Sequence, residues 1–600
     1  MKVNITETCH DHIENYLAGH SSMGADIWGA HKDTDGMYIF RLLAPNADEV
    51  YIKGDFTSWE NTKMTKNTKY GYFFIKLDAN PGDYYKYIVV HEGNWVEKTD
   101  PFARAMDKEG DFASIITDDS YDFSDEEFIK QRDKNFDKPL NIYEIHIGSW
   151  LRYNDNVNFL DIVDRLVSYV KEMNYTHVEI MPITEYPYYP SWGYQSSGFF
   201  ATSSRFGSPV DLKKFVDILH QNGIGVILDM VAVHFASDYF GLDHFDGTGM
   251  YESIYPDLKY SEWGSNNFDY SKGHVRSFMK SAMTYWLENF HFDGIRIDAV
   301  SYMIHYNGNK NRGVHKDNIE FIKDLNKTIH EAFPNVMLIA EDSSDFPQVT
   351  GKVEDGGLGF DYKWDLGWMN DTLDYFKKTS DERRENLGKL TFSMMYAWNE
   401  HYILPFSHDE NVHGKATIVQ KMYGEYEGKF PQARALYLYM AIHPGKMLDF
   451  MGNEFAQLRE FDESREQDWM VLKYPNHDDF HRYRRALNEA YLANEAFWSR
   501  EYDPEAFRWL DCAHPELDAC AIWRDGHDGA VLAAFNFGDT ELADYTLTLP
   551  RAGKLTKLLD TDWQCFGGRT EKPKRLVGKA CGGELKLTLA PFSGQLFKLV

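Results

Sequence analysis

Short apolar runs alternate with longer amphipathic stretches through the middle of the chain. Strands are predicted at 141–147, 176–183, 223–231, 292–300, 335–342, 360–366, 402–409 and 447–453. Helices are predicted at 159–173, 209–222, 272–290, 316–333, 368–379, 382–398, 430–442 and 478–493. Eight strand-then-helix units predict an α/β fold, a (β/α)8 or TIM barrel with insertions. A doubly wound open sheet would show the same alternation, but the glycine fingerprint typical of its dinucleotide-binding members is missing.

The regions on either side of this alternating segment have a different pattern. Before it, short runs at 37–43, 50–56, 71–77 and 84–90 are separated by turn residues, which predicts a small β-sandwich. After it, runs at 519–523, 529–537, 544–549 and 585–589 predict an antiparallel β domain. We therefore expect an N-terminal segment with short helices (1–30), the sandwich (31–118), a charged linker carrying a short helix (119–138), the barrel (139–495) and the terminal β domain (496–600).

Composition and charge narrow the class of protein. The 600 residues are 43% hydrophobic and 26% charged, which is typical of globular domains. The formal net charge of −30 disfavours binding to nucleic acid or to an anionic membrane. The chain has no apolar run of about 18 residues and no signal-peptide pattern at its start, so we expect neither a membrane span nor secretion.

The five cysteines include no CxxC pair, so neither a zinc site nor a disulfide framework is indicated, and we expect a cytoplasmic protein. Aromatic residues make up 16% of the chain. They can fill the cores of the domains or provide flat faces on which sugars stack, and composition does not separate these alternatives.

Four carboxylates lie at or near the ends of predicted barrel strands: Asp229, Asp298, Glu341 and Asp409. Functional groups of such barrels gather at the carboxyl ends of the strands. A carboxylate at the end of a buried strand is unfavourable unless it is paired or used. Any one of these acids could cap the next helix or form an ion pair, but four on one rim favour a reactive site.

Neighbouring residues indicate what these acids could do. Arg296 and Asp298 are two positions apart and point to the same face, so the guanidinium would stabilise a charged nucleophile. Glu341 follows an apolar run and faces other acids, which suits a carboxyl group that must keep its proton. His234 and His408 could donate to sugar hydroxyls or could be structural. Two such carboxylates are the general means of cleaving a glycosidic bond, although the sugar, the anomer and the acceptor stay open.

The residues around these acids resemble the four signature regions of the α-amylase family, the family 13 glycoside hydrolases. The matching stretches are 229–234, 294–300, 341 and 407–409. Longer segments, at 143–150, 191–209, 241–252, 406–415 and 451–455, are similar to the glycogen branching enzymes of that family. The segment 42–59 looks like the glucan-binding β module of family 48. The resemblance covers nearly the whole chain.

The resemblance implies a retaining transglycosylase that cleaves an α-1,4-glucan chain and transfers it to a glucose 6-hydroxyl, making the α-1,6 branches of glycogen. It implies that Asp298 is the nucleophile, Glu341 the general acid and base, and Asp409 the acid that stabilises the transition state. It also implies a set of residues that hold the reacting glucose: Tyr194, Asp229, His234, Arg296 and His408. The implied partners are glycogen, amylose and amylopectin-like chains, with no organic cofactor and no required metal.

The sequence departs from the family pattern at a few positions. Val231-Ala232-Val233 replaces a stretch that usually contains proline, and the loop 301–316 looks short. This loop is expected to line the cleft, which leaves the length of the transferred chain open. Two alternatives remain: a hydrolase of the amylase or debranching type, and a glucan-binding protein without catalytic activity. The presence of all three acids disfavours the second.

Overall fold

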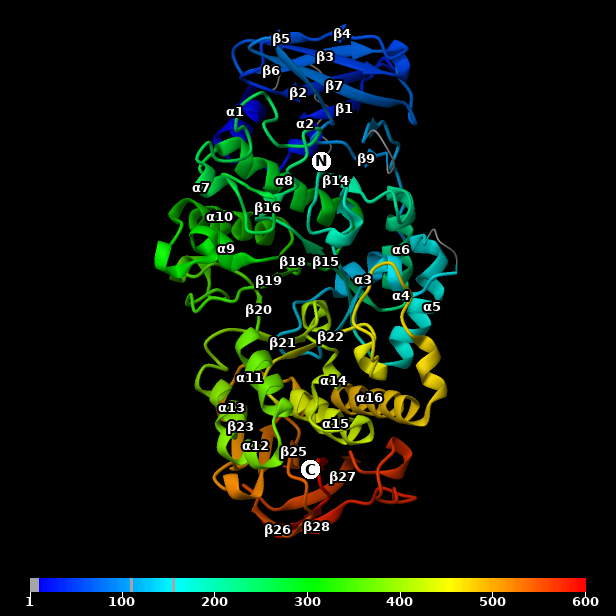
Figure 1. Cartoon of the computed structure of the whole chain (residues 1–600), viewed down its shortest axis with the longest axis vertical. Helices are drawn as coiled ribbons and strands as arrows, with labels where there is room; N and C mark the ends of the chain where they lie inside the picture. The colour runs from blue at the N-terminus through cyan, green and yellow to red at the C-terminus, as the bar shows by residue number, and fades with distance from the viewer. Residues whose placement is uncertain (1–9, 108–111, 154–156) are drawn as a thin grey trace. The chain divides into compact units, whose positions relative to one another are not determined.

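The computed structural model describes residues 10–107, 112–153 and 157–600 (Figure 1). These residues fall into two compact units. The first comprises 1–133, 152–164 and 180–361, and the second comprises 134–151, 165–179 and 362–600. Each unit is described below by itself. The domain boundaries drawn from the sequence stay predictions.

The N-terminal region contains the predicted β-sandwich. One sheet has the order β1-β2-β6-β5, with strands Gly29–Lys32, Tyr38–Leu43, Tyr72–Leu77 and Thr65–Asn67. The other has the order β4-β3-β7-β10-β9, with strands Thr62–Lys63, Glu49–Gly54, Tyr84–His91, Ser114–Ile115 and Ala105–Met106, and β8 (Asn94–Lys98) also pairs with β7. The rings of Phe40 in β2 and Tyr85 in β7 lie 5.2 Å apart, so aromatic residues fill the space between the two sheets.

Short helices occur where the sequence predicts them. Helices α1 (His10–Ala18) and α2 (Gly24–Ile27) precede the sandwich, and α3 (Glu126–Gln131) lies within the predicted linker. The N-cap position of α3 is Asp125, which is buried. This carboxylate connects the linker to the barrel segments of the same unit, as described below.

All eight predicted barrel strands are confirmed, and they form a closed parallel barrel. The strands are β11 (Asn141–Ile145), β12 (His177–Ile180), β15 (Gly225–Met230), β18 (Gly294–Ile297), β19 (Met337–Ala340), β20 (Tyr362–Trp364), β21 (Tyr402–Phe406) and β22 (Lys446–Phe450), in that order around the barrel. Seven of them are buried along their whole length, and β12 all but its first residue, which explains their nearly continuous apolar sequences. The predicted (β/α)8 fold is therefore correct.

The main helices also match the prediction, with one exception. They are α5 (Phe159–Glu172), α6 (Pro209–Gln221), α8 (Gly273–Phe290), α10 (Lys316–Ala332), α11 (Leu366–Lys377), α15 (Tyr426–Ile442) and α16 (Pro475–Ala493). The single helix predicted over 382–398 is wrong. This stretch forms α12 (Ser380–Asn386), α13 (Gly388–Thr391) and a 3-10 turn, because a Thr379–Glu382 capping box starts the helix early and Gly388 follows its end.

The C-terminal residues form the predicted antiparallel β domain. Its larger sheet has the order β23-β24-β25-β30-β27-β28, with strands Phe507–Asp511, Ala519–Asp525, Ala530–Asn536, Ser593–Leu599, Gly553–Asp560 and Lys579–Cys581. Strands β26 (Leu542–Thr548) and β29 (Glu584–Leu589) form a second, two-stranded sheet. Four of these strands (β23, β27, β28 and β30) are additional to the prediction. Strand β30 contains Gly594 and Gln595 yet lies between β25 and β27, so tertiary pairing overrides its weak local preference.

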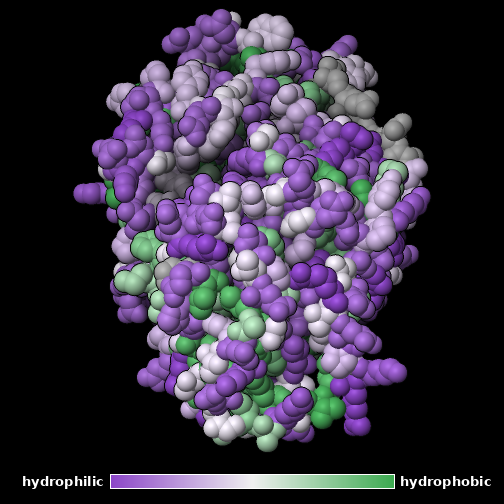
Figure 2. All heavy atoms as spheres, turned by 60° about the horizontal axis from the view of Figure 1, so that its bottom comes forward, coloured by the Kyte–Doolittle hydropathy of each residue, from purple (hydrophilic) through white to green (hydrophobic). Residues whose placement is uncertain are grey.

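The surface seen in Figure 2 is mainly hydrophilic, with smaller hydrophobic areas among the charged and polar side chains. This agrees with the large excess of acidic over basic residues. Within the described residues, no helix has both the length and the apolar character that crossing a membrane requires.

A buried histidine connects the linker to the barrel segments of the first unit. His220 on α6 contacts Asp125 through Nδ1 at 2.7 Å and Asp293 through Nε2 at 2.9 Å. Arg132 donates to the other oxygen of Asp293 at 2.7 Å. Burial by itself would lower the pKa of His220, but the charges and hydrogen bonds of the two aspartates outweigh burial and raise this pKa to about 9.

This cluster predicts that stability decreases as the pH rises above neutrality. The folded-state pKa of His220 lies above the value of about 6.5 in the unfolded chain, so its contribution is complete below pH 6.5 and is lost by about pH 9. The change is about 3 kcal/mol, since one pKa unit corresponds to about 1.4 kcal/mol. Thermal unfolding of the wild type and of His220→Gln should show a difference in midpoint that shrinks between pH 6.5 and 9.5. A difference that stays constant over this range would contradict the charged state of His220.

Candidate active site

A fully buried arginine joins the acids of the first unit. The parallel register of β15 and β18 places Asp229 beside Arg296. Nη1 of Arg296 donates to Asp229 Oδ1 at 2.8 Å and to Asp298 Oδ1 at 2.7 Å. Burial opposes the charge of Arg296, but Asp229 and the other acids keep the pKa of the guanidinium well above its usual value. The predicted pairing of Arg296 with Asp298 is therefore confirmed.

Asp229 forms the buried end of this cluster. Tyr194 donates its hydroxyl to Asp229 Oδ2 at 2.5 Å, and the Tyr194 ring lies 5.9 Å from the Arg296 guanidinium. Burial raises the pKa of Asp229 to about 6, although the attraction of Arg296 works in the opposite direction. The hydroxyl contact of Tyr194 is not foreseen by the sequence, and the stacking of its ring on glucose stays a prediction.

Asp298 and Glu341 follow two adjacent parallel strands, β18 and β19. The ladder continues past the strand ends, since Glu341 N–H donates to Ile297 O at 3.0 Å and Val300 N–H donates to Glu341 O at 2.8 Å. Between them, Ala299 has a φ of 49°, in the left-handed region, and its N–H donates to Glu341 Oε2 at 2.7 Å. For a residue other than glycine this conformation costs about 1–2 kcal/mol.

The two acids differ from Asp229 in their access to solvent. The side chains of Asp298 and Glu341 are 17% and 16% exposed, whereas that of Asp229 is 1% exposed. The Arg296 guanidinium lies 2.7 Å from Asp298 but 3.9 Å from Glu341. The first unit therefore presents two reachable carboxyl groups, of which Asp298 is held more closely by a positive charge.

His234 lies just beyond β15 in the same unit. It belongs to β16 (His234–Phe235), which pairs with β17 (Asn266–Asn267). Burial lowers the pKa of His234 to about 4, with the charge of Asp298 acting in the opposite direction. The imidazole is therefore neutral at ordinary pH and can donate through one ring nitrogen and accept through the other.

The second unit holds His408 and Asp409, directly after β21. His408 Nδ1 lies 2.5 Å from Glu144 Oε1, and the backbone N–H of His408 donates to Glu144 Oε2 at 2.9 Å. The Nε2 atom of His408 lies 3.6 Å from Asp409 Oδ1. Glu144, on β11, is fully buried and fixes the orientation of the imidazole. Sequence reasoning missed this residue, although it lies within the recognised segment 143–150 and is an acid on a buried strand.

The structure thus places the eight predicted residues in two groups. Contacts within the first unit join five of them. His234 belongs to the same unit and lies on β16, which pairs with β17. His408 and Asp409 belong to the second unit. Five residues make up the joined group: Tyr194, Asp229, Arg296, Asp298 and Glu341.

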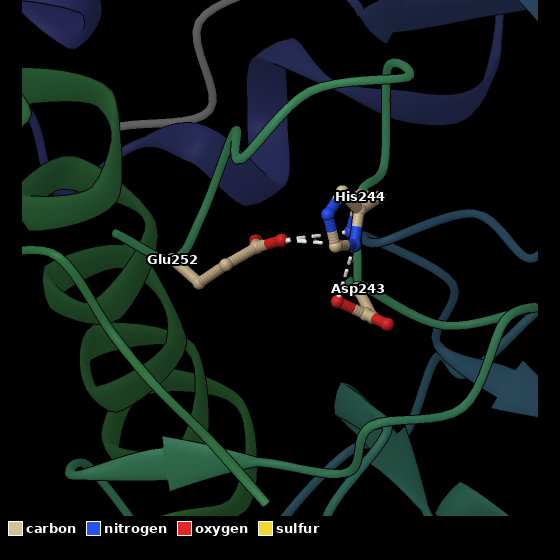
Figure 3. Close-up of side chains that lie close together, drawn as sticks. All are labelled: Asp243, His244 and Glu252. Atoms are coloured by element: carbon tan, nitrogen blue, oxygen red, sulfur yellow. Dashed lines mark hydrogen bonds and ion pairs between the residues drawn. The ribbon is translucent and has the colours of Figure 1, made fainter. Parts of the chain in front are cut away.

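Elsewhere in the first unit, three potential metal ligands come together: Asp243, His244 and Glu252 (Figure 3). The Lys259 ammonium lies among them, 2.8 Å from Asp243 Oδ1 and 3.5 Å from Glu252 Oε1. Burial works against the charge of Lys259, but its carboxylate partners raise its pKa above the usual value. A side chain of the protein therefore supplies the positive charge at this position. The sequence-based expectation that no metal is required stays a prediction.

Family models match three parts of the chain. The N-terminal residues 27–103 match "Carbohydrate-binding module 48 (Isoamylase N-terminal domain)". Residues 154–263 and 257–455 match "Alpha amylase, catalytic domain", and residues 509–600 match "Alpha amylase, C-terminal all-beta domain". Together with the barrel and its acid cluster, these matches define an enzyme of the α-amylase family.

Whole-chain relatives specify the group within that family. The chain is 42% identical over 580 residues to the 1,4-alpha-glucan branching enzyme GlgB of Fusobacterium nucleatum, covering 94% of each chain. It is 40% identical to the enzyme of the same name from Aquifex aeolicus, covering 88% of each, and 36% identical to that of Bacillus subtilis, covering 99% of this chain and 98% of the relative. The chain therefore belongs to the 1,4-alpha-glucan branching enzymes.

Solved structures of more distant proteins share the fold. A type I pullulanase from Bacillus subtilis, complexed with maltose, has a TM-score of 0.74 at 17% identity and covers 96% of this chain and 85% of its own. A pullulanase from Anoxybacillus, complexed with maltotetraose, has a TM-score of 0.71 at 18% identity and covers 99% and 90%. At these identities the likeness concerns the fold alone.

The Glu144–His408 contact predicts that Glu144, although buried, affects activity by orienting His408. Replacing Glu144 with Gln removes a charge-assisted hydrogen bond worth about 1.5–3 kcal/mol, so kcat/KM should fall about 10- to 100-fold. The double variant Glu144→Gln/His408→Gln should be no less active than His408→Gln alone, because the two residues act as one unit. Steady-state kinetics on amylose measure both effects. Losses that add up in the double variant would show that Glu144 acts independently of His408.

Proposed function

We propose that the protein is a retaining transglycosylase that makes α-1,6 branches in glycogen by transferring segments of α-1,4-glucan chains. Glycogen, amylose and amylopectin-like chains are its proposed substrates. The observation that carries the proposal is the pair Asp298 and Glu341, which follow adjacent strands and share the Arg296 guanidinium. Membership of the branching-enzyme family supports the choice of reaction.

In the first step, Asp298 attacks C1 of a glucose within the donor chain. The bond between C1 and the glycosidic oxygen breaks, and Glu341 gives its proton to that oxygen. The product is a glucosyl ester on Asp298 with inverted configuration. In the second step, the 6-hydroxyl of an acceptor glucose attacks C1, its proton passes to Glu341, and Asp298 leaves. The second inversion restores the α configuration.

The other predicted residues position the reacting glucose and stabilise its positive charge. We infer that Asp409, which follows β21 of the same barrel, grips sugar hydroxyls in the transition state, and that His408 beside it is oriented by Glu144. Asp229, His234 and Arg296 hold the same glucose from the first unit, and Tyr194 stacks on it. The neutral state of His234 supports its part in this arrangement, since a neutral imidazole carries one N–H and no charge.

The acceptor must compete with water at the covalent intermediate. A glucan held at the N-terminal module, residues 27–103, would raise the effective concentration of 6-hydroxyl groups near the barrel. This advantage requires no new contact at the reacting atoms. It would favour transfer to a glucan over hydrolysis by the same acids.

A location in the cytoplasm is also part of the proposal. Glycogen is the proposed product, and the five cysteines show no paired motif. Fractionation of the native host, with the enzyme followed by its branching activity, measures this directly.

The proposed reaction can be tested on amylose with three readings from one time course. Iodine colour should fall while reducing ends stay constant, and a debranching enzyme added afterwards should release new reducing ends. This is expected because each transfer conserves the number of reducing ends and creates one α-1,6 bond. Asp298→Ala, as the control, should show none of these changes. If reducing ends instead rise in step with the loss of colour, the protein is a hydrolase and the proposal is wrong.

A further inference from the structure

A partly exposed tryptophan adjoins the predicted glucose-binding histidine. The Trp263 ring centroid lies 5.1 Å from that of His234 and 4.5 Å from that of Tyr302. Its side chain nevertheless remains 40% exposed. Tyr302 lies on α9 (Val300–Ile304), four residues after Asp298. The three rings therefore form an aromatic surface that adjoins His234 on one side and the segment after Asp298 on the other.

Hydrogen bonds fix the backbone that carries this ring. The Trp263 N–H donates to Ser261 Oγ at 3.2 Å, and Gln195 donates its side-chain amide to Trp263 O at 3.2 Å. Gly264 O accepts from Ser237 Oγ at 3.0 Å. Gln195 directly follows Tyr194, so the loop of Trp263 is connected to the segment that reaches Asp229.

The residues just before Trp263 are anchored as well. Lys259 forms an ion pair with Asp243, which is drawn in Figure 3, and Asn307 donates to Asp257 O at 3.0 Å. Tyr302 donates its hydroxyl to Glu262. Two of these anchors, Tyr302 and Asn307, belong to the segment 301–316, which the sequence predicts to line the cleft. The loop that carries the ring is thus anchored at several points, as a preorganised binding surface requires.

We propose that Trp263, supported by Tyr302, is a stacking position for a glucose of the bound α-1,4-glucan next to the glucose held at His234. This rests on the proposed function. The C–H face of a glucose ring is apolar and matches the flat indole, while its hydroxyls remain in water. A contact to a sugar away from the cleaved bond strengthens binding of the chain in the ground state and the transition state alike, so it lowers KM more than it raises kcat.

Two substitutions at this position test the proposal through KM. In Trp263→Ala the KM for amylose should rise about tenfold, which corresponds to about 1.4 kcal/mol, and kcat should change by less than about threefold. Trp263→Phe should keep most of the wild-type KM, because a flat ring remains. Tyr255→Ala is the matched control. It removes another exposed aromatic ring from the same segment between β16 and β17, and it should leave KM unchanged.

A direct binding measurement distinguishes failure of this proposal from failure of the proposed reaction. Calorimetry with maltoheptaose should show about tenfold weaker affinity for Asp298→Ala/Trp263→Ala than for Asp298→Ala, with equal thermal midpoints. An unchanged affinity, an unchanged KM, or equal losses in Trp263→Ala and Tyr255→Ala would overturn the role of Trp263. These results leave the reaction itself intact, because its own failure would appear as the absence of new branches with the wild type.

Discussion

The buried guanidinium of Arg296 is the constraint on which the site depends. It lies on β18 without solvent exposure and contacts Asp229 on one neighbouring strand and Asp298 at the end of its own. Its charge compensates acids that could not otherwise be buried, since removing one partner of such a pair costs about 3–5 kcal/mol. The same charge places Asp298 where a nucleophile is needed. The contacts of Arg296 with these two aspartates therefore both stabilise this end of the barrel and position the proposed nucleophile.

The parallel pairing of β18 with β19 also fixes the position of Glu341 relative to Asp298. Gly294 allows β18 and β19 to approach closely, because a Cβ at this position would lie 3.0 Å from Met337 O. Two residues beyond the end of β18, the left-handed turn at Ala299 directs an N–H to the carboxylate of Glu341. In the second unit Glu144 orients His408 in a comparable way, from a neighbouring barrel strand. Asp298, Glu341 and His408 are thus each held in position by a hydrogen-bond partner within the protein.

Much of this arrangement can be predicted from local sequence. The eight strands can be predicted because buried parallel strands are nearly continuous apolar runs. The four acids Asp229, Asp298, Glu341 and Asp409 can be predicted as site residues because they lie at or near the ends of those runs. What could not be predicted depends on contacts between residues far apart in the chain. Glu144 meets His408 across 264 positions, and β30 becomes a strand only because β25 and β27 flank it. Trp263 gains significance only when it is seen beside His234 and Tyr302.

The central claim is that Asp298 forms a covalent bond with the anomeric carbon while Glu341 transfers the proton. The most direct test is mass spectrometry of Glu341→Gln after brief reaction with α-maltosyl fluoride. Fluoride leaves without a proton from the enzyme, whereas the second step lacks its base, so the intermediate should accumulate. The account predicts a maltosyl adduct on the peptide that contains Asp298. An adduct on a different carboxylate, or turnover of the donor with no adduct at all, would contradict it.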